Sequence, residues 1–205
     1  MIISQIVEGG LFTWLILICF AFGIVVAIER IIALYRAHTD GGQLIAELST
    51  SLDDGGVNAA IAVCARRPGP LTNVFHAGLL RSGKGIKHVE HALSTAGAIE
   101  MGMLEKNLIW LVSVVSVAPM LGFVGTVTGL IGAFDVIASS GNLSPSLIAS
   151  SIAQALRPTA LGLIVGIFTQ VAHSYCVTRI DRIVAEMEES TQEFVDLLIE
   201  KQIVK

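Results

Sequence analysis

The sequence predicts an all-α integral membrane protein with three transmembrane helices, and its composition and the spacing of its charges carry that prediction. Of 205 residues, 53% are hydrophobic and only 15% are charged, with a mean hydropathy of +0.74. A soluble domain of this length carries about 25% charged residues. Three segments, 11–28, 107–134 and 139–156, contain no charged residue. A bilayer core of about 30 Å needs roughly 20 apolar helical residues, which each segment reaches with its flanks.

The first predicted span covers about residues 11–34 and is interpreted as a retained anchor. A cleaved signal peptide would have a positively charged start, a shorter apolar run and a small-residue cleavage site, and none of these is present. Trp14 lies near the outer end of the span, where membrane proteins concentrate aromatic residues. Glu29 and Arg30 lie near its inner end.

The long segment between the first and second spans is predicted to be a soluble domain of short helices. Asp40-Gly41-Gly42 and Asp53-Asp54-Gly55-Gly56 are expected to interrupt it, and Arg67-Pro68-Gly69-Pro70 is expected to form a turn. Apolar residues follow helical spacing at 57–64 and 88–104. The alternation of a strand is found nowhere, so the helices are expected to pack on one another.

The second and third spans are predicted at 108–138 and 146–178, longer than a bilayer requires. Their surplus length is expected to project into the cytoplasm and join the helical bundle. A charged C-terminal segment has an apolar stripe that indicates bundle packing: Ile180, Val184, Met187, Phe194, Leu197 and Leu198. The predicted division is 1–35 (periplasmic N-terminus and first span), 36–105 (cytoplasmic loop domain), 106–139 (second span), 140–146 (periplasmic loop), 147–178 (third span) and 179–205 (cytoplasmic C-terminal helix).

The positions of Lys and Arg predict the orientation. None precedes the first span and none lies between the second and third spans, whereas the long loop and the C-terminal segment carry several. Basic residues concentrate on the cytoplasmic side of membrane proteins. The N-terminus is therefore expected outside and the long loop and the C-terminus inside, a parity that three spans satisfy.

Several function classes are disfavoured by the sequence. The net charge of −4 gives no reason to expect a nucleic acid partner. Cys19, Cys64 and Cys176 are far apart and odd in number, so free thiols are expected rather than a disulfide framework or a metal site. No nucleophile and base pair, metal ligand set or phosphate-binding loop is recognisable, and the segment 81–85 lacks the GxxxxGK[ST] spacing. An enzyme, a cofactor and a bound metal are therefore not predicted.

Small and polar residues recur at steps of three or four along both later spans. They are Ser113, Ser116, Pro119, Gly122, Thr126, Gly129 and Ala133, and then Ser151, Ala155, Thr159, Gly162, Gly166 and Gln170. One interpretation is close helix packing, which small residues allow in membranes. The other is a polar lane whose hydroxyls offer oxygen atoms to a cation or to water, since intramembrane polar groups often mark a pathway.

Two long motifs carry a resemblance to a known family. The segment 118–134, APMLGFVGTVTGLIGAF, closely resembles the second-span signature of the ExbB/TolQ family, within the MotA/TolQ/ExbB proton channel superfamily. The segment 152–163, IAQALRPTALGL, resembles its third-span signature. Residues 28–30, residues 67–71 and the Glu-bearing helix before the second span agree as well, so the resemblance covers nearly the whole chain.

The resemblance implies an ion-driven motor subunit in the bacterial inner membrane. Members form a pentamer around a dimer of a single-span ExbD/TolR-like protein, whose membrane Asp takes up a proton from the periplasm. Ion passage is thought to turn the inner dimer and to drive envelope processes such as TonB-dependent uptake, through a TonB/TolA-like protein. MotA has four spans, so three spans favour the ExbB/TolQ branch.

The family's pore threonines match Thr126 and Thr159 by position. The resemblance implies that both are hydroxyl ligands or proton-relay contacts that face the partner's Asp. The alternative is that each hydroxyl bonds to the preceding turn of its own helix.

Four further residues are candidates for a role in or near the pathway: Asp135, Gln154, Arg157 and His173. Gln154 stands where the family usually has Glu, and an amide cannot relay a proton by titrating, so sodium becomes an alternative ion to the proton. Arg157 lies within the third span, where a charge is costly, and helical geometry turns it about 200° from Thr159. We hypothesise that it pairs with Asp135, within or between subunits, and that it hydrogen-bonds Gln154.

His173 lies near the cytoplasmic end of the third span. It is interpreted either as a pH-responsive residue at the ion exit or as an interfacial hydrogen-bonding residue. Gln154 and Arg157 together also keep open a second function: a non-conducting membrane scaffold that holds a single-span partner.

Overall fold

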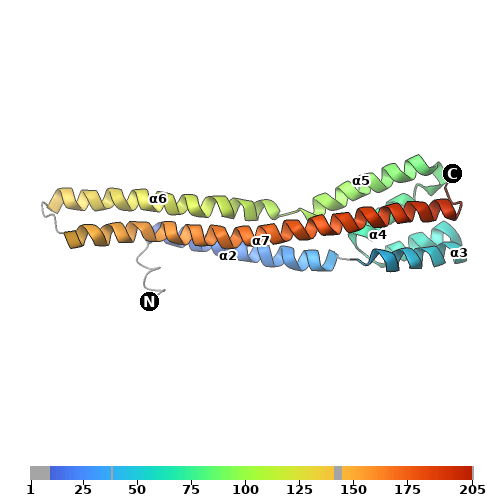
Figure 1. Cartoon of the computed structure of the whole chain (residues 1–205), viewed down its shortest axis with the longest axis horizontal. Coiled ribbons are helices and arrows are strands. Elements are labelled where there is room, and N and C mark those ends of the chain that lie inside the picture. Colours follow the sequence, from blue (N-terminus) through green and yellow to red (C-terminus); the bar gives the residue numbers. More distant parts are fainter. Residues whose placement is uncertain (1–9, 38, 141–144, 205) are drawn as a thin grey trace. The chain divides into compact units, whose positions relative to one another are not determined.

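The computed structural model describes residues 10–37, 39–140 and 145–204. Its elements in chain order are α2 (Gly10–Ala37), α3 (Gly41–Arg66), α4 (Pro70–Leu79), the 3₁₀ helix η1 (Ser82–Lys84), α5 (Ile86–Leu104), α6 (Leu108–Ser140) and α7 (Pro145–Glu200) (Figure 1). These described ranges contain no strand. Three helices are long and apolar enough to cross a membrane, and they lie within Gly10–Arg66, Ile86–Ser139 and Ile148–Glu200. The predicted all-α fold with three membrane-spanning helices is confirmed.

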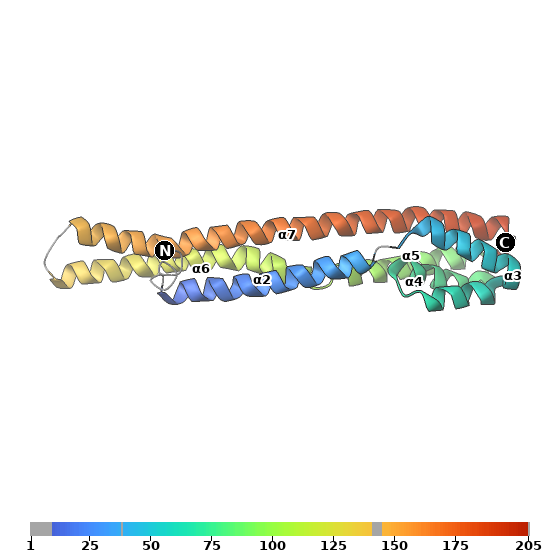
Figure 2. The ribbon, with the colours of Figure 1, turned by 90° about the horizontal axis from the view of Figure 1, so that it is seen from below.

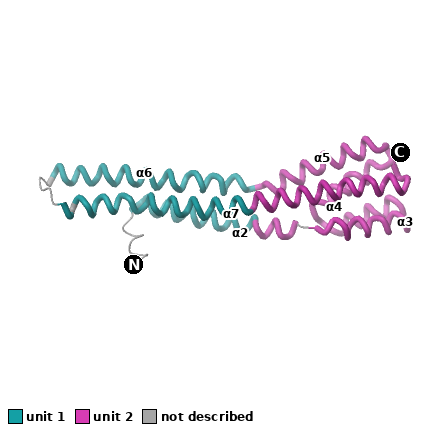
Figure 3. The backbone as a smooth tube through the Cα atoms, in the orientation of Figure 1, with its two compact units in different colours: residues 1–30, 107–175 teal, residues 31–106, 176–205 magenta. Residues whose placement is uncertain are grey.

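The chain forms two compact units, coloured separately in Figure 3. Unit 1 comprises residues 1–30 and 107–175, and therefore holds most of α2, all of α6 and the first part of α7. Unit 2 comprises residues 31–106 and 176–205, with the helices α3, α4 and α5 and the last part of α7.

In unit 1 the helices α6 and α7 run side by side (Figure 2). The buried core is small and is formed by Ile16 of α2, Val114 and Ala118 of α6 and Val165 of α7. Many large apolar side chains of this unit point outward instead: Phe123 is 65% exposed and Phe168 is 64% exposed. An apolar surface of this kind is what a helix presents to lipid or to another apolar helix.

Unit 2 has a core of large apolar side chains. Phe75 of α4 and Phe194 of α7 are both fully buried, and their rings stack with centroids 4.3 Å apart. Leu48 of α3 and Leu93 of α5 are also buried. The predicted C-terminal stripe packs here: Ile180, Met187, Phe194 and Leu198 are buried, and Val184 and Leu197 are half-buried.

The predicted breaks in the segment between the first two spans correspond to features of α3. The carboxylate of Asp40 caps the N-terminus of α3 by accepting a hydrogen bond from the amide of Gln43 at 3.2 Å. Gly56 has φ of 66° and interrupts the helix, a conformation that a side chain would strain. The helix ends at Arg66, and the turn before Pro70 opens α4 with proline in the first helical turn, where its missing N–H costs nothing.

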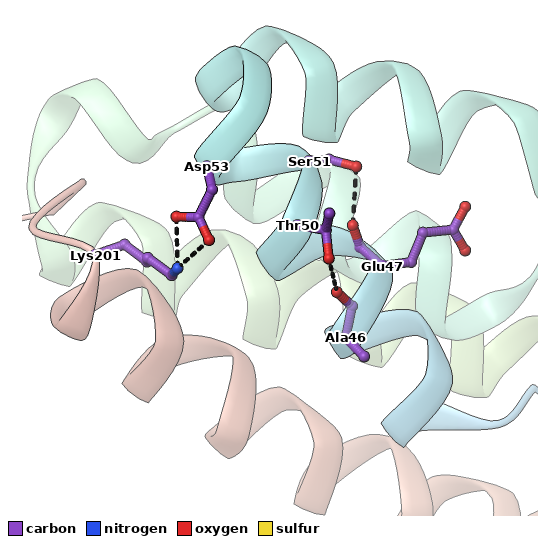
Figure 4. A network of polar contacts seen from close by, with 6 residues as sticks. All are labelled: Ala46, Glu47, Thr50, Ser51, Asp53 and Lys201. Atoms are coloured by element: carbon purple, nitrogen blue, oxygen red, sulfur yellow. Dashed lines mark hydrogen bonds and ion pairs between the residues drawn. The ribbon is translucent and has the colours of Figure 1, made fainter.

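An ion pair connects α3 to the C-terminal end of α7 within unit 2 (Figure 4). The ammonium group of Lys201 lies 2.5 Å from both carboxylate oxygens of Asp53. Nearby, the hydroxyls of Thr50 and Ser51 bond to carbonyl groups one turn earlier in α3. The pair thus lies just before the break at Gly56.

The third predicted span and the C-terminal segment belong to one helix of 56 residues, Pro145–Glu200. Pro158 lies inside this helix, and Pro119 lies inside α6, without ending either one. Cys19, Cys64 and Cys176 form no disulfide with one another, as predicted.

Candidate ion pathway site

Close approach of α6 and α7 positions the site in unit 1. A Cβ atom added at Gly122 would lie 2.8 Å from the Cα of Thr159, and one added at Gly162 would lie 2.5 Å from the carbonyl oxygen of Ala118. One added at Gly129 would lie 2.7 Å from the Cβ of Ala155. The small residues of the two predicted stripes therefore face each other, and no larger residue fits at this distance.

The structure brings Thr126 and Thr159, the two predicted pathway residues, into direct contact. Their hydroxyl groups are hydrogen-bonded to each other. The Thr159 hydroxyl also donates to the carbonyl oxygen of Gly122 at 2.8 Å, across the interface between the helices. The Thr126 hydroxyl reaches the same carbonyl at 3.3 Å. We call this group of Gly122, Thr126 and Thr159 the hydroxyl cluster.

The hydroxyl cluster has a defined hydrogen-bonding capacity. A threonine hydroxyl has one proton to donate and two lone pairs that accept. The Thr159 proton is used by the Gly122 carbonyl, and the Thr126 proton is used by that carbonyl or by Thr159. Both protons remain inside the cluster, so a further ligand must offer a proton or a positive charge. Water, a protonated carboxylic acid and a cation meet this requirement, whereas a carboxylate does not.

Other threonines of the same helices behave differently. Thr128 of α6 bonds to Val124 at 2.9 Å, and Thr169 of α7 bonds to Val165 at 2.9 Å, so each bonds within its own helix. This is the ordinary way for a membrane helix to satisfy a hydroxyl. The alternative of back-bonding holds in part for Thr126, whereas the donor bond of Thr159 crosses to the other helix.

Gln154 lies outside the hydroxyl cluster and lines a hollow of about 380 Å³ within unit 1. The hollow is bounded by the start of α2 and by small residues of α6 and α7, among them Gly129 and Ser151. The side chain of Gln154 is exposed. It offers amide groups to this hollow but cannot titrate.

Asp135, Arg157 and His173 do not converge with the cluster. Asp135 is exposed near the end of α6, Arg157 is half-buried in α7 and His173 is half-buried further along the same helix. The pairing of Asp135 with Arg157, within or between subunits, stays a prediction, as do the hydrogen bond between Arg157 and Gln154 and the roles expected for Gln154 and His173.

Sequence reasoning did not identify two features of the site. The first is the carbonyl of Gly122, which belongs to the cluster because it faces Thr159. Helical spacing in the sequence shows which residues share a face of a helix, but not which backbone groups of another helix they contact. Thr128, which lines the hollow beside Gln154, was also missed. The steps between Gly125, Gly129 and Gly132 on that side of α6 are the signal that could have indicated the hollow.

The class of protein follows from these features: a helical membrane protein with a polar site between two long spans. Comparisons with known proteins agree, because residues 67–189 match the model of the MotA/TolQ/ExbB proton channel family. The chain belongs to this family. The chain is similar to a biopolymer transport protein ExbB homolog of Methanothermobacter thermautotrophicus, with 30% identity over 182 residues. The aligned segment covers 88% of this chain and 64% of the relative.

Two further relatives match over shorter lengths. The Tol-Pal system protein TolQ of Haemophilus influenzae is 31% identical over 113 residues, 55% of this chain and 50% of the relative. The biopolymer transport protein ExbB of Aquifex aeolicus is 36% identical over 77 residues, 38% of this chain and 52% of the relative. The chain therefore spans between half and just under two thirds of the length of these relatives.

Proposed function

We propose that this protein is the ion-conducting subunit of an ExbB/TolQ-type motor, that its copies form a pentamer, and that the hydroxyl cluster lies on the ion path. The observation that carries the proposal is the cross-helix bond from Thr159 to the carbonyl of Gly122, with Thr126 bonded beside it. The motor uses the proton motive force, with sodium as the alternative ion.

The chemistry of the hydroxyl cluster supports a proton-loaded partner. A dimer of a single-span ExbD/TolR-like protein would present a membrane carboxylic acid to each cluster. The cluster accepts hydrogen bonds from the protonated acid and has no proton to offer the carboxylate. Loading and release of the proton would therefore change the affinity of the partner for the cluster, which is what a motor requires.

The proposed setting is the bacterial inner membrane, with the N-terminus periplasmic and the C-terminus cytoplasmic. The distribution of Lys and Arg supports this orientation. The output would be an envelope process such as TonB-dependent uptake, through a TonB/TolA-like protein. The names of the relatives, biopolymer transport protein and Tol-Pal system protein, support a process of this class.

Ion flux through the reconstituted complex tests the proposal. The chain is purified together with its single-span partner, and proton entry into proteoliposomes is followed with an enclosed pH dye under an imposed potential. Thr159→Val keeps the shape of the side chain but removes the hydroxyl, so flux should fall about tenfold or more if about one hydrogen bond to the ion or its carrier is lost. Thr169→Val is the matched control, because that hydroxyl bonds only within α7, and flux should be unchanged.

The same preparation tests the identity of the ion and the assembly. Proton entry that does not depend on sodium supports the proton, and sodium-dependent flux supports the alternative that Gln154 raises. Native mass spectrometry should give five copies with two copies of a small single-span protein. A complete complex that conducts no ion would instead indicate the non-conducting scaffold, for which the non-titrating Gln154 is the favouring observation.

A further inference from the structure

A groove lies in unit 2 between α5 and the last part of α7. Its volume is about 620 Å³, and its α5 side is formed by Leu93, Gly97, Ala98 and Met101. A Cβ atom added at Gly97 would meet nothing within 4 Å, so the floor of the groove is open at this position. Met187 and Val195 of α7 extend the apolar lining. The groove is thus large enough to receive side chains from outside.

The opposite side of α5 carries an apolar ridge. Ile99 is 60% exposed and Met103 is 50% exposed, and the two are one helical turn apart. At about 100° per residue, Ile99 lies roughly 200° from Gly97, and Met103 lies roughly 200° from Met101. One helix therefore presents a groove on one face and a ridge on the other.

The groove and the ridge also lie at the same level along α5. Two residues separate Gly97 from Ile99, and a helix rises about 1.5 Å per residue, so the levels differ by about 3 Å. A contact between unlike surfaces of identical copies gives a closed ring when successive copies are related by rotation alone. It gives a helical filament when each copy is also shifted along the axis. Matched levels favour the ring.

The charges of the two faces are compatible. The rim of the groove carries the exposed carboxylates Glu90 and Glu188. The side of α5 that bears the ridge has no carboxylate, and its ionisable residues are the exposed His88 and His91. A second copy that docks its ridge in the groove would bring His88 level with Glu90 and meet no like charge.

We infer that unit 2 contains a head-to-tail interface between copies of this chain, in which Ile99 and Met103 of one copy fill the groove over Gly97 of the next. The inference rests on the proposed ring of identical copies and adds the surface through which the ring closes outside the hydroxyl cluster. Burial of two exposed apolar side chains at each contact provides the driving force.

Disulfide cross-linking in native membranes tests the interface. The three native cysteines are replaced by Ala, and Gly97→Cys is combined with Ile99→Cys. Within one chain the two thiols point to opposite sides of α5, so they cannot form a bridge without unwinding the helix. Between copies each chain forms two different bridges, and oxidation should give a ladder at multiples of 21.7 kDa. Either single variant can give at most a dimer, because one thiol pairs once.

A second measurement tests the interface without the cysteine double variant, in case that variant does not fold. Gly97→Leu places a side chain in the groove at a position where the added Cβ meets no atom within 4 Å, and it should weaken association about tenfold or more, measured as the oligomer fraction on dilution in detergent. Gly83→Leu is the control, because this position is equally open but lies outside groove and ridge. Equal association of both variants would overturn the inference.

The two proposals can fail separately. A ladder that stops at the dimer, or a cross-link to a protein of another mass, would overturn the interface while leaving Thr159-dependent flux intact. A full ladder in a complex that conducts no ion would support the interface and refute the conducting function.

Discussion

Different interactions stabilise the interior of each of the two units. Unit 1 brings α6 and α7 together through glycines and a bond between a hydroxyl and a backbone carbonyl. Unit 2 packs large apolar side chains, and among the residues that the structure describes it contains ten of the twelve largest fully buried side chains. Helices in lipid gain little from hiding apolar groups, so they depend on close contact and hydrogen bonds, whereas helices in water gain most from burial.

The two proposed sites also differ between the units. Close contact in unit 1 leaves polar groups at an interface that lipid cannot satisfy, and the hydroxyl cluster is formed from them. Unit 2 also buries polar side chains, among them Thr72 and Glu100, and it has in addition an open groove and an apolar ridge at its surface. Substitutions that remove or add side-chain volume should therefore have opposite effects on stability in the two units, which tests this comparison.

Removal of a large side chain should damage unit 2 most. Phe194 is fully buried and stacks on Phe75, so Phe194→Ala should cost about 3–5 kcal/mol of stability through lost transfer energy and a cavity. The measurement is thermal unfolding of the detergent-solubilised protein, with protease cleavage within 36–105 as a second readout. Phe168→Ala, in unit 1, is the control: the side chain is 64% exposed, and the change should be much smaller. Equal effects would refute the contrast.

Addition of a small group should damage unit 1 instead. Gly162→Ala would place a methyl group 2.5 Å from a backbone oxygen of α6, so the helices must separate, at a cost of about 1–3 kcal/mol. Gly132→Ala meets no neighbour within 4 Å and should be neutral or stabilising, because Ala favours a helix by about 1 kcal/mol.

This prediction is tested by comparing the melting temperatures of the two glycine variants with that of the unchanged protein. Equal melting temperatures for both variants would show that α6 and α7 do not depend on contact at Gly162. Gly162→Ala should also weaken the bond from Thr159 to Gly122, since Thr159 lies one turn away on the same helix.

The sequence was sufficient for most of the fold because local rules decide it. Asp40 caps a helix, Gly56 breaks one, and charge-free segments of sufficient length identify the spans. The structure also brought Thr126 and Thr159 together, the pair that the resemblance had indicated. What could not be predicted depends on which faces meet. The use of the Gly122 carbonyl by Thr159, and the groove over Gly97, arise from packing between segments distant in the chain.

The last prediction concerns Cys64, a small buried group in unit 2. Burial raises the pKa of this thiol from 9.0 to about 11, and the nearby charge of Glu47 adds to the effect. The folded state therefore keeps its proton at a pH where the unfolded chain loses it. Folding stability is unaffected by this group below about pH 9 and falls as the pH rises toward about 11. The melting temperature should fall more steeply over this range in the unchanged protein than in Cys64→Ala, which has no thiol to ionise. Parallel curves would mean that Cys64 is accessible to water, and the thiol should then also react quickly with iodoacetamide in the folded protein.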